Sequence, residues 1–260
     1  MAANKESVGR TLLVAFLVCL VCAVVVSTAA VTLRPTQEAN RVLDRQINIL
    51  RAADRYEPGI NVQEEFDKIE RRFVDIDTGE YVDMPEDYDQ RRASRDDDMG
   101  RRIPGDQDIA SIRRQAKVAE VYLVLDDEGE VTRLILPLHG YGLWSTMYGF
   151  LSLEMDINTI AGVVFDEHGE TPGLGGEIDN PRWRANWEGK QLFDDEGRVA
   201  FEIIKGSVDS SAQGSEYRVD GLSGATLTAN GVTNAVRFWM GDNGFGPYLD
   251  RLRSDSAQLN

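Results

Sequence analysis

The most distinctive chemistry in the sequence lies at residues 220–228, which read Asp-Gly-Leu-Ser-Gly-Ala-Thr-Leu-Thr. This polar turn precedes a predicted helix whose apolar stripe repeats at i, i+3, i+4 and i+7, namely Val232, Ala235, Val236 and Trp239. The first backbone N–H groups of a helix have no partner within it and favour an anion, so a phosphate would bind well here. Alternatively, the hydroxyl of Ser223, Thr226 or Thr228 simply caps the helix.

Two glycine-rich segments provide further backbone that can approach a ligand closely. Residues 140–145 read Gly-Tyr-Gly-Leu-Trp-Ser, and residues 168–176 read His-Gly-Glu-Thr-Pro-Gly-Leu-Gly-Gly. Glycine permits close approach and unusual backbone angles, and the proline stiffens the second loop. Both segments also fit ordinary structural turns. We expect His168 to make a hydrogen bond within its loop rather than to bind a metal.

The rest of the chain offers no catalytic constellation and no metal site. There are two histidines, and both cysteines, Cys19 and Cys22, lie in an apolar N-terminal run. A Gly-x-Gly-x-x-Gly dinucleotide motif after a strand is also absent from the sequence. With 28 basic and 44 acidic side chains, the net charge of −16 argues against nucleic-acid binding.

Residues 220–226 match the signature Asp-x-x-Ser/Thr-Gly-Ala-Thr of flavin domains in which FMN is joined by a phosphoester to the final threonine. With the two glycine-rich segments and the apolar N-terminus, the chain resembles the family of C subunits of Na⁺-translocating NADH:quinone oxidoreductases. The resemblance implies one FMN, covalently attached to Thr226. It also implies a pocket formed by Ser223, Gly224 and Ala225 in the attachment turn, Thr171, Leu174 and Gly175 along the isoalloxazine ring, and Trp144 and Ser145 on another side.

The function implied by this resemblance is that of a membrane-anchored flavoprotein subunit. It would relay electrons from NADH toward quinone in a sodium-pumping respiratory complex, and the flavin rather than a side chain would perform the redox chemistry. The implied partners are the other membrane subunits, the lipid bilayer and a flavin transferase that recognises Asp220. Two alternatives stay open: the G subunit of an Rnf-type ferredoxin:NAD complex, and a flavin-free anchored extracytoplasmic binding module.

An uncharged run from residue 11 to residue 33, bracketed by Arg10 and Arg34, predicts a transmembrane helix. A cleaved signal peptide is the alternative, although its apolar core is usually shorter. Lys5 and Arg10 precede this run and Arg34, Arg41 and Arg45 follow it, so counting positive charges leaves both orientations open. The expectation is a cytoplasmic N-terminus, residues 1–10, with an exported body. Together with this topology, the resemblance implies a single-pass protein of the bacterial inner membrane with its flavin domain on the periplasmic side.

The helices and strands predicted around the motif indicate an α+β fold. One N-terminal transmembrane helix is followed by one mixed α+β FMN-binding domain. We expect a helical and charged membrane-proximal segment at residues 34–110 and the FMN-binding domain at residues 111–260. Within the first segment, residues 37–53 read as an amphipathic helix. Asn61 and Glu64 read as a capping box that opens a helix through Phe66, Ile69 and Phe73, and residues 80–108 as a solvated charged surface. Strands are predicted at residues 118–125, 131–138, 159–165, 199–205 and 216–219.

Overall fold

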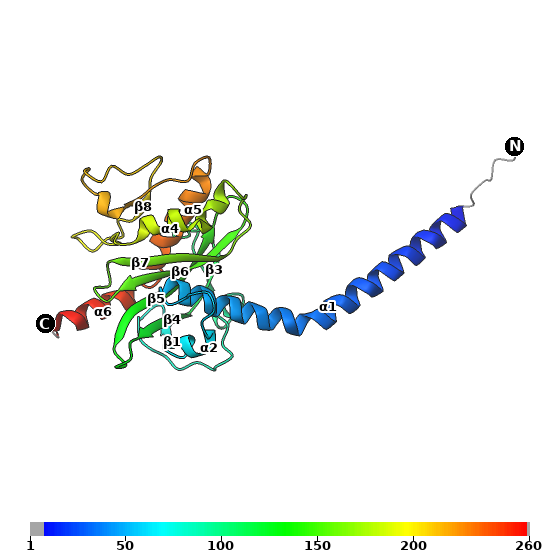
Figure 1. The fold of residues 1–260 in the computed structure, drawn as a ribbon, viewed down its shortest axis with the longest axis horizontal. Coiled ribbons are helices and arrows are strands. Elements are labelled where there is room, and N and C mark those ends of the chain that lie inside the picture. The colour runs from blue at the N-terminus through cyan, green and yellow to red at the C-terminus, as the bar shows by residue number, and fades with distance from the viewer. Residues whose placement is uncertain (1–7, 259–260) are drawn as a thin grey trace. The chain divides into compact units, whose positions relative to one another are not determined.

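The computed structural model describes residues 8–258, and the chain divides between Arg45 and Gln46 into two compact units. The first unit contains most of helix α1 (Val8–Ala52), which is blue in Figure 1. This helix is long and apolar enough to cross a membrane. Residues 1–7, which include most of the expected cytoplasmic N-terminus, lie outside the described residues.

The helices expected at residues 11–33 and 37–53 are one continuous helix. Pro35 lies inside α1 and does not end it. Proline removes one backbone donor and crowds the preceding turn, but an apolar run before it and an amphipathic run after it continue the helix on both sides. The last turn of α1 belongs to the second unit, where Ile49 and Leu50 are fully buried.

The second unit is built on a five-stranded antiparallel sheet in the order β1-β4-β5-β6-β7. The strands are β1 (Ile69–Asp75), β4 (Val118–Leu125), β5 (Val131–Tyr141), β6 (Thr146–Glu154) and β7 (Ile160–Glu167). Two small sheets accompany it: β2 (Gly100–Arg102) pairs with β3 (Arg114–Ala116), and β8 (Glu202–Ile203) pairs in parallel with β9 (Arg218–Val219).

Both faces of the main sheet are covered, which explains the nearly continuous apolar character of its central strands. On one face, helix α5 (Thr226–Met240) packs its buried stripe against β5, and α6 (Gly246–Gln258) follows it. On the other face, the end of α1 and the segment with α2 (Val62–Phe66) cover Ile135 and Phe150. The stripe predicted for α5 is confirmed, since Val232, Val236 and Trp239 are fully buried.

Short helices complete the second unit between the strands. These are α3 (Gln90–Ala93), η1 (Gly175–Asp179), α4 (Pro181–Arg184), η2 (Ala185–Trp187) and η3 (Ser215–Tyr217). The charged segment 80–108 is only partly a solvated surface, because Tyr88, Ala93 and Ile103 are buried. Within it, the carboxylate of Asp96 accepts the amides of Asp98 and Met99.

The helix expected to open at Asn61 and run through Phe73 is confirmed only at its start, because α2 follows Asn61 directly. Helix α2 ends at Phe66, strand β1 begins at Ile69, and Asn61 makes no side-chain capping bond. All seven residues of β1 pair with β4, so the sheet overrides the local helical spacing. The apolar residues Ile69 and Phe73 are spaced i, i+4, so the local pattern favours a helix rather than a strand.

Other strand predictions need correction at their limits. Strand β5 extends to Tyr141, and the following strand β6 is not among the strands predicted from the sequence. Of the strand expected at 199–205, Glu202–Ile203 form β8 and Val199 makes an isolated bridge to Phe193. Residues 216–219 divide between η3 and β9. Pairing partners for these short strands come from distant residues, which local patterns do not reveal.

Candidate functional site

Glu170 connects all three segments that the sequence singles out. Its Oε1 accepts the backbone N–H groups of Leu143, Trp144 and Ser145 at 3.1, 2.9 and 3.3 Å. Its Oε2 accepts the hydroxyl of Thr228 at 2.6 Å. The side chain is buried, with 4% of the residue exposed. One carboxylate therefore joins the β5–β6 turn, the glycine-rich loop and the start of α5.

The glycine-rich loop is held by further hydrogen bonds around Glu170. The Ser145 hydroxyl accepts the N–H of Gly169 at 2.6 Å. His168 accepts the N–H of Glu170 at Nδ1, at 3.2 Å, and its Nε2 lies 2.7 Å from the carboxylate of Asp179. The expected role of His168 as a hydrogen-bonding residue of the loop is confirmed. These contacts fix the loop next to the β5–β6 turn.

Two glycines leave the space that this carboxylate occupies. A Cβ on Gly142 would lie 2.6 Å from Oε1 of Glu170. A Cβ on Gly175 would lie 2.8 Å from Oε2 and only 2.5 Å from Oγ1 of Thr228. Such distances are far below van der Waals contact, so any larger residue would push the segments apart.

Helix α5 begins at Thr226 and has no side-chain cap. Ala225 occupies the N-cap position, and the hydroxyl of Thr228 is directed to Glu170 instead. Thr226 itself is exposed at the first helical position, after a turn in which Gly224 has a φ of +72°. The capping interpretation of Ser223, Thr226 and Thr228 is therefore wrong. An exposed hydroxyl stands at the positive end of a 15-residue helix.

Exposed apolar side chains belong to the same segments. Trp144 is 64% and Leu227 60% exposed, and Leu143 and Leu174 are exposed as well. Leu174 lies beside the attachment turn, since a Cβ on Gly224 would be 3.0 Å from its Cδ2. A flat apolar group bound here would cover side chains that otherwise face water.

A small cavity of about 80 Å³ adjoins Thr226. Its lining includes Lys205, Gly206, Leu222 and Asn230. It is far too small for a flavin ring. Sequence reasoning misses Lys205, since nothing in its local pattern relates it to the start of α5 further along the chain.

Asp220 has a structural role in the attachment turn. Its carboxylate accepts the N–H of Val208 at 2.7 Å, and its carbonyl accepts the indole N–H of Trp183 at 2.8 Å. Thr171 has a similar role in the other loop, where its carbonyl accepts the N–H groups of Leu174 and Gly176. Both residues shape the loops that carry the candidate site.

The charge state of the buried groups follows from their contacts. Burial by itself would raise the pKa of Glu170, but the hydroxyl of Thr228 and the three backbone N–H groups outweigh it and lower that pKa below the ordinary value. Glu170 is therefore a carboxylate at neutral pH. Burial lowers the pKa of His139 to about 3, so this histidine is a neutral ring packed between Tyr148 and Trp239.

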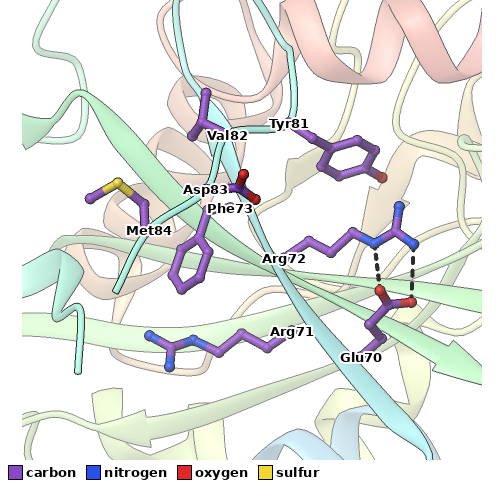
Figure 2. A pocket seen from close by; sticks show the side chains of 8 residues that line it. All are labelled: Glu70, Arg71, Arg72, Phe73, Tyr81, Val82, Asp83 and Met84. Atoms are coloured by element: carbon purple, nitrogen blue, oxygen red, sulfur yellow. Dashed lines mark hydrogen bonds and ion pairs between the residues drawn. The ribbon is translucent and has the colours of Figure 1, made fainter. Parts of the chain in front are cut away.

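Two larger hollows lie away from the three segments. One, of about 580 Å³, is lined by the end of α1, β7 and α4. The other, of about 400 Å³, follows β1 in Figure 2, where Arg72 makes hydrogen bonds of 2.8 and 3.1 Å to Glu70. Arg71 beside it pairs with Glu120 at 3.0 Å. None of the predicted site residues lines either hollow, and residues 8–258 contain no cluster suited to a metal ion.

Comparison with known proteins agrees with this location. The FMN-binding domain family matches residues 142–241, which contain the β5–β6 turn, the glycine-rich loop and all of α5. The chain is 50% identical to the C subunit of the Na(+)-translocating NADH-quinone reductase of Pseudomonas aeruginosa, over 98% of this chain and all of that protein. It is 48% identical to the corresponding protein of Vibrio alginolyticus over the full length of both.

Solved structures show the same similarity. The crystal structure of NqrC from Shewanella oneidensis superposes with a TM-score of 0.77 at 37% identity, covering 83% of this chain and 99% of that one. The corresponding protein from Parabacteroides distasonis gives a TM-score of 0.64 at 27% identity, covering 84% of this chain and 96% of that one. The α+β fold predicted from the sequence is confirmed.

Proposed function

The chain belongs to the family of C subunits of the Na⁺-translocating NADH-quinone reductases, and from this we propose that it is the subunit that carries FMN on Thr226. It is an FMN-binding, electron-transferring subunit of a sodium-pumping complex, and its partners are the other subunits of that complex. The relatives do not favour an Rnf-type subunit, and the FMN-binding domain match does not favour a flavin-free module. When bound, FMN supplies the redox chemistry.

The observation that carries this proposal is the exposed hydroxyl of Thr226 at an uncapped helix start. The first N–H groups of α5 and the nearby Lys205 favour a phosphate at this position. A helix terminus stabilises an exposed anion by about 0.3–1 kcal/mol, too little to retain a cofactor without other contacts. A phosphoester to Thr226 keeps the cofactor bound whatever its redox state.

The remaining pocket residues follow from their positions around Thr226. Ser223, Gly224 and Ala225 form the turn that presents the hydroxyl. The exposed side chains of Trp144, Leu174 and Thr171 lie in the segments that would face the flavin ring. Ser145 and Gly175 would support these segments. Ser145 accepts the N–H of Gly169 in the glycine-rich loop, and Gly175 lies against Thr228.

Maturation and topology complete the proposal. A flavin transferase would attach FMN to the turn whose shape Asp220 maintains through Val208 and Trp183. Helix α1 would be the single membrane anchor of an inner-membrane protein, with residues 1–10 in the cytoplasm and the flavin domain in the periplasm. Residues 111–260 would form the FMN-binding domain, and residues 34–110 would form the membrane-proximal segment, which contributes β1 to the same sheet.

The test is to compare Thr226→Ala with Ser223→Ala in full-length protein from cells that assemble the complex. Both variants remove an exposed hydroxyl from the same turn. We expect Thr226→Ala to lose flavin fluorescence in a denaturing gel and Ser223→Ala to keep it. Circular dichroism should show both variants folded, since neither hydroxyl caps α5. A fluorescent denatured Thr226→Ala band would overturn the proposal.

A further inference from the structure

We propose that Glu170 is a positioning residue that fixes the flavin-bearing start of α5 relative to the Trp144 turn. This inference rests on the proposed attachment of FMN at Thr226. It concerns a residue that makes no predicted contact with the flavin and acts through the segments that do. Three features support the role: the groups that the two carboxylate oxygens bind, the tight enclosure of the side chain, and the segments that it connects.

The two carboxylate oxygens of Glu170 bind different segments of the chain. Oε1 accepts three successive backbone N–H groups, those of Leu143, Trp144 and Ser145, where β5 turns into β6. Oε2 accepts the hydroxyl of Thr228, which is 58 residues away in the chain. The turn and the helix therefore share one acceptor group, and neither can shift without breaking a hydrogen bond to a buried charge.

The surroundings allow the carboxylate very little freedom. Gly142 and Gly175 approach it so closely that a Cβ on either would lie within 2.8 Å of a carboxylate oxygen. The backbone N–H of Glu170 is also bound, by Nδ1 of His168. The backbone and the carboxylate of Glu170 are both held in place, so the length of its side chain determines how far the β5–β6 turn lies from α5.

This spacing determines the relation between two residues of the proposed site. Thr226 lies two residues before Thr228 in the first turn of α5. The amide of Trp144 is bound directly by Oε1 at 2.9 Å. Glu170 thus sets the separation between the attachment hydroxyl and the exposed indole. Its carboxylate also lies beside the first turn of α5, where a negative charge is favourable.

Three substitutions separate positioning from general stability. Glu170→Gln keeps the length of the side chain, an acceptor for the three amides and a donor for the Thr228 oxygen. Glu170→Asp keeps the charge but is one methylene shorter, by about 1.3 Å, so it cannot reach both partners. Glu177→Asp is the matched control, because Glu177 lies in the same region and its carboxylate accepts a hydrogen bond from the neighbouring Asn180 side chain instead of joining distant segments.

The experiment measures covalently bound flavin per protein, the visible circular dichroism of the flavin and its midpoint potential, in full-length protein. We expect Glu170→Asp to lower the labelled fraction about fivefold, the ratio that corresponds to one lost hydrogen bond. Its flavin dichroism should also change. Glu170→Gln should restore labelling and dichroism while the potential becomes more positive, because a nearby negative charge is removed. Glu177→Asp should match the wild type in all three.

Thr228→Val tests the same hydrogen bond from its other partner, since it removes only the hydroxyl and keeps the shape of the side chain. It should also change the flavin dichroism, so the test stands without Glu170→Asp if that variant fails to fold. Wild-type labelling, dichroism and potential in Thr228→Val or in folded Glu170→Asp would overturn the role of Glu170. Loss of label in Thr226→Ala alongside that result would leave the proposed function standing, so the two failures are distinguishable.

Discussion

Gly175 and Thr228 meet so closely that a Cβ on the glycine would lie 2.5 Å from the threonine Oγ1. The contact joins the glycine-rich loop to the first turn of α5 directly, alongside the bridge that Glu170 makes. A glycine is required here for lack of space rather than for backbone freedom, since its φ is not positive.

Gly175→Val should therefore separate the loop from α5. We expect the substitution to destabilise the fold by about 1–3 kcal/mol, as for other overpacked sites, and to shift the flavin spectrum while the covalent bond to Thr226 persists. Urea unfolding and the visible spectrum measure the two effects. Gly162→Ala is the control, because its Cβ would make ordinary contact at 3.7 Å. An unchanged spectrum and potential in Gly175→Val would remove this loop from the flavin pocket.

Lowering the pH should weaken the hydrogen bonds by which Glu170 joins the β5–β6 turn to α5. The pKa of Glu170 is lower in the folded protein than in the unfolded chain, so its carboxylate stabilises the fold above the unfolded value of about 4.3. That stabilisation decreases as the pH falls through the folded pKa. Thermal unfolding from pH 7 to pH 3 should show a larger loss of Tm for the wild type than for Glu170→Gln. Parallel curves for the two proteins would contradict an ionised Glu170.

The motif at residues 220–226 can be found from the sequence because its information is local. The motif occupies seven consecutive residues, and the stripe of α5 follows the helical period, so both can be found without knowledge of the fold. Glu170 stands inside a segment that the sequence singles out, yet its partners lie 26 and 58 residues away. No spacing in the sequence relates these positions, and only the sheet brings them together.

The errors in the predicted secondary structure also arise from contacts between residues far apart in the sequence. Ile69 and Phe73 have spacing suitable for a helix, but pairing with β4 makes them a strand. Strand β6 is absent from the predicted strands, and within it a Cβ on Gly149 would be 2.5 Å from the carbonyl oxygen of Val164 on the neighbouring strand. Pairing and packing between strands determine the structure at these positions, and the local sequence pattern does not contain that information.

Removal of the apolar helix should release the folded unit from the membrane. A protein of residues 46–260 retains Ile49 and Leu50, which are buried against the sheet, and lacks the apolar window of α1. We expect it to be soluble and to unfold cooperatively. A version that begins at residue 34 should also be soluble. Partition of either protein with membranes after alkaline extraction, without the other subunits, would contradict a single anchor.

Reporter fusions test the proposed orientation. A C-terminal fusion places the reporter after α6, beyond the proposed periplasmic domain. An alkaline phosphatase reporter, which requires export, should be active, and a green fluorescent protein reporter should be dark when exported through the general secretory route. The reverse pattern would put the flavin domain in the cytoplasm.

The most direct test of flavin attachment is to locate the flavin on the native chain by peptide mass spectrometry. A proteolytic peptide that spans residues 219–237 contains the attachment turn and the start of α5. We predict that it carries the mass of one FMN joined with loss of water, that fragmentation assigns it to Thr226, and that unmodified peptide is scarce. The same FMN mass on another residue, or a fully unmodified Thr226 in yellow active protein, would contradict attachment at Thr226.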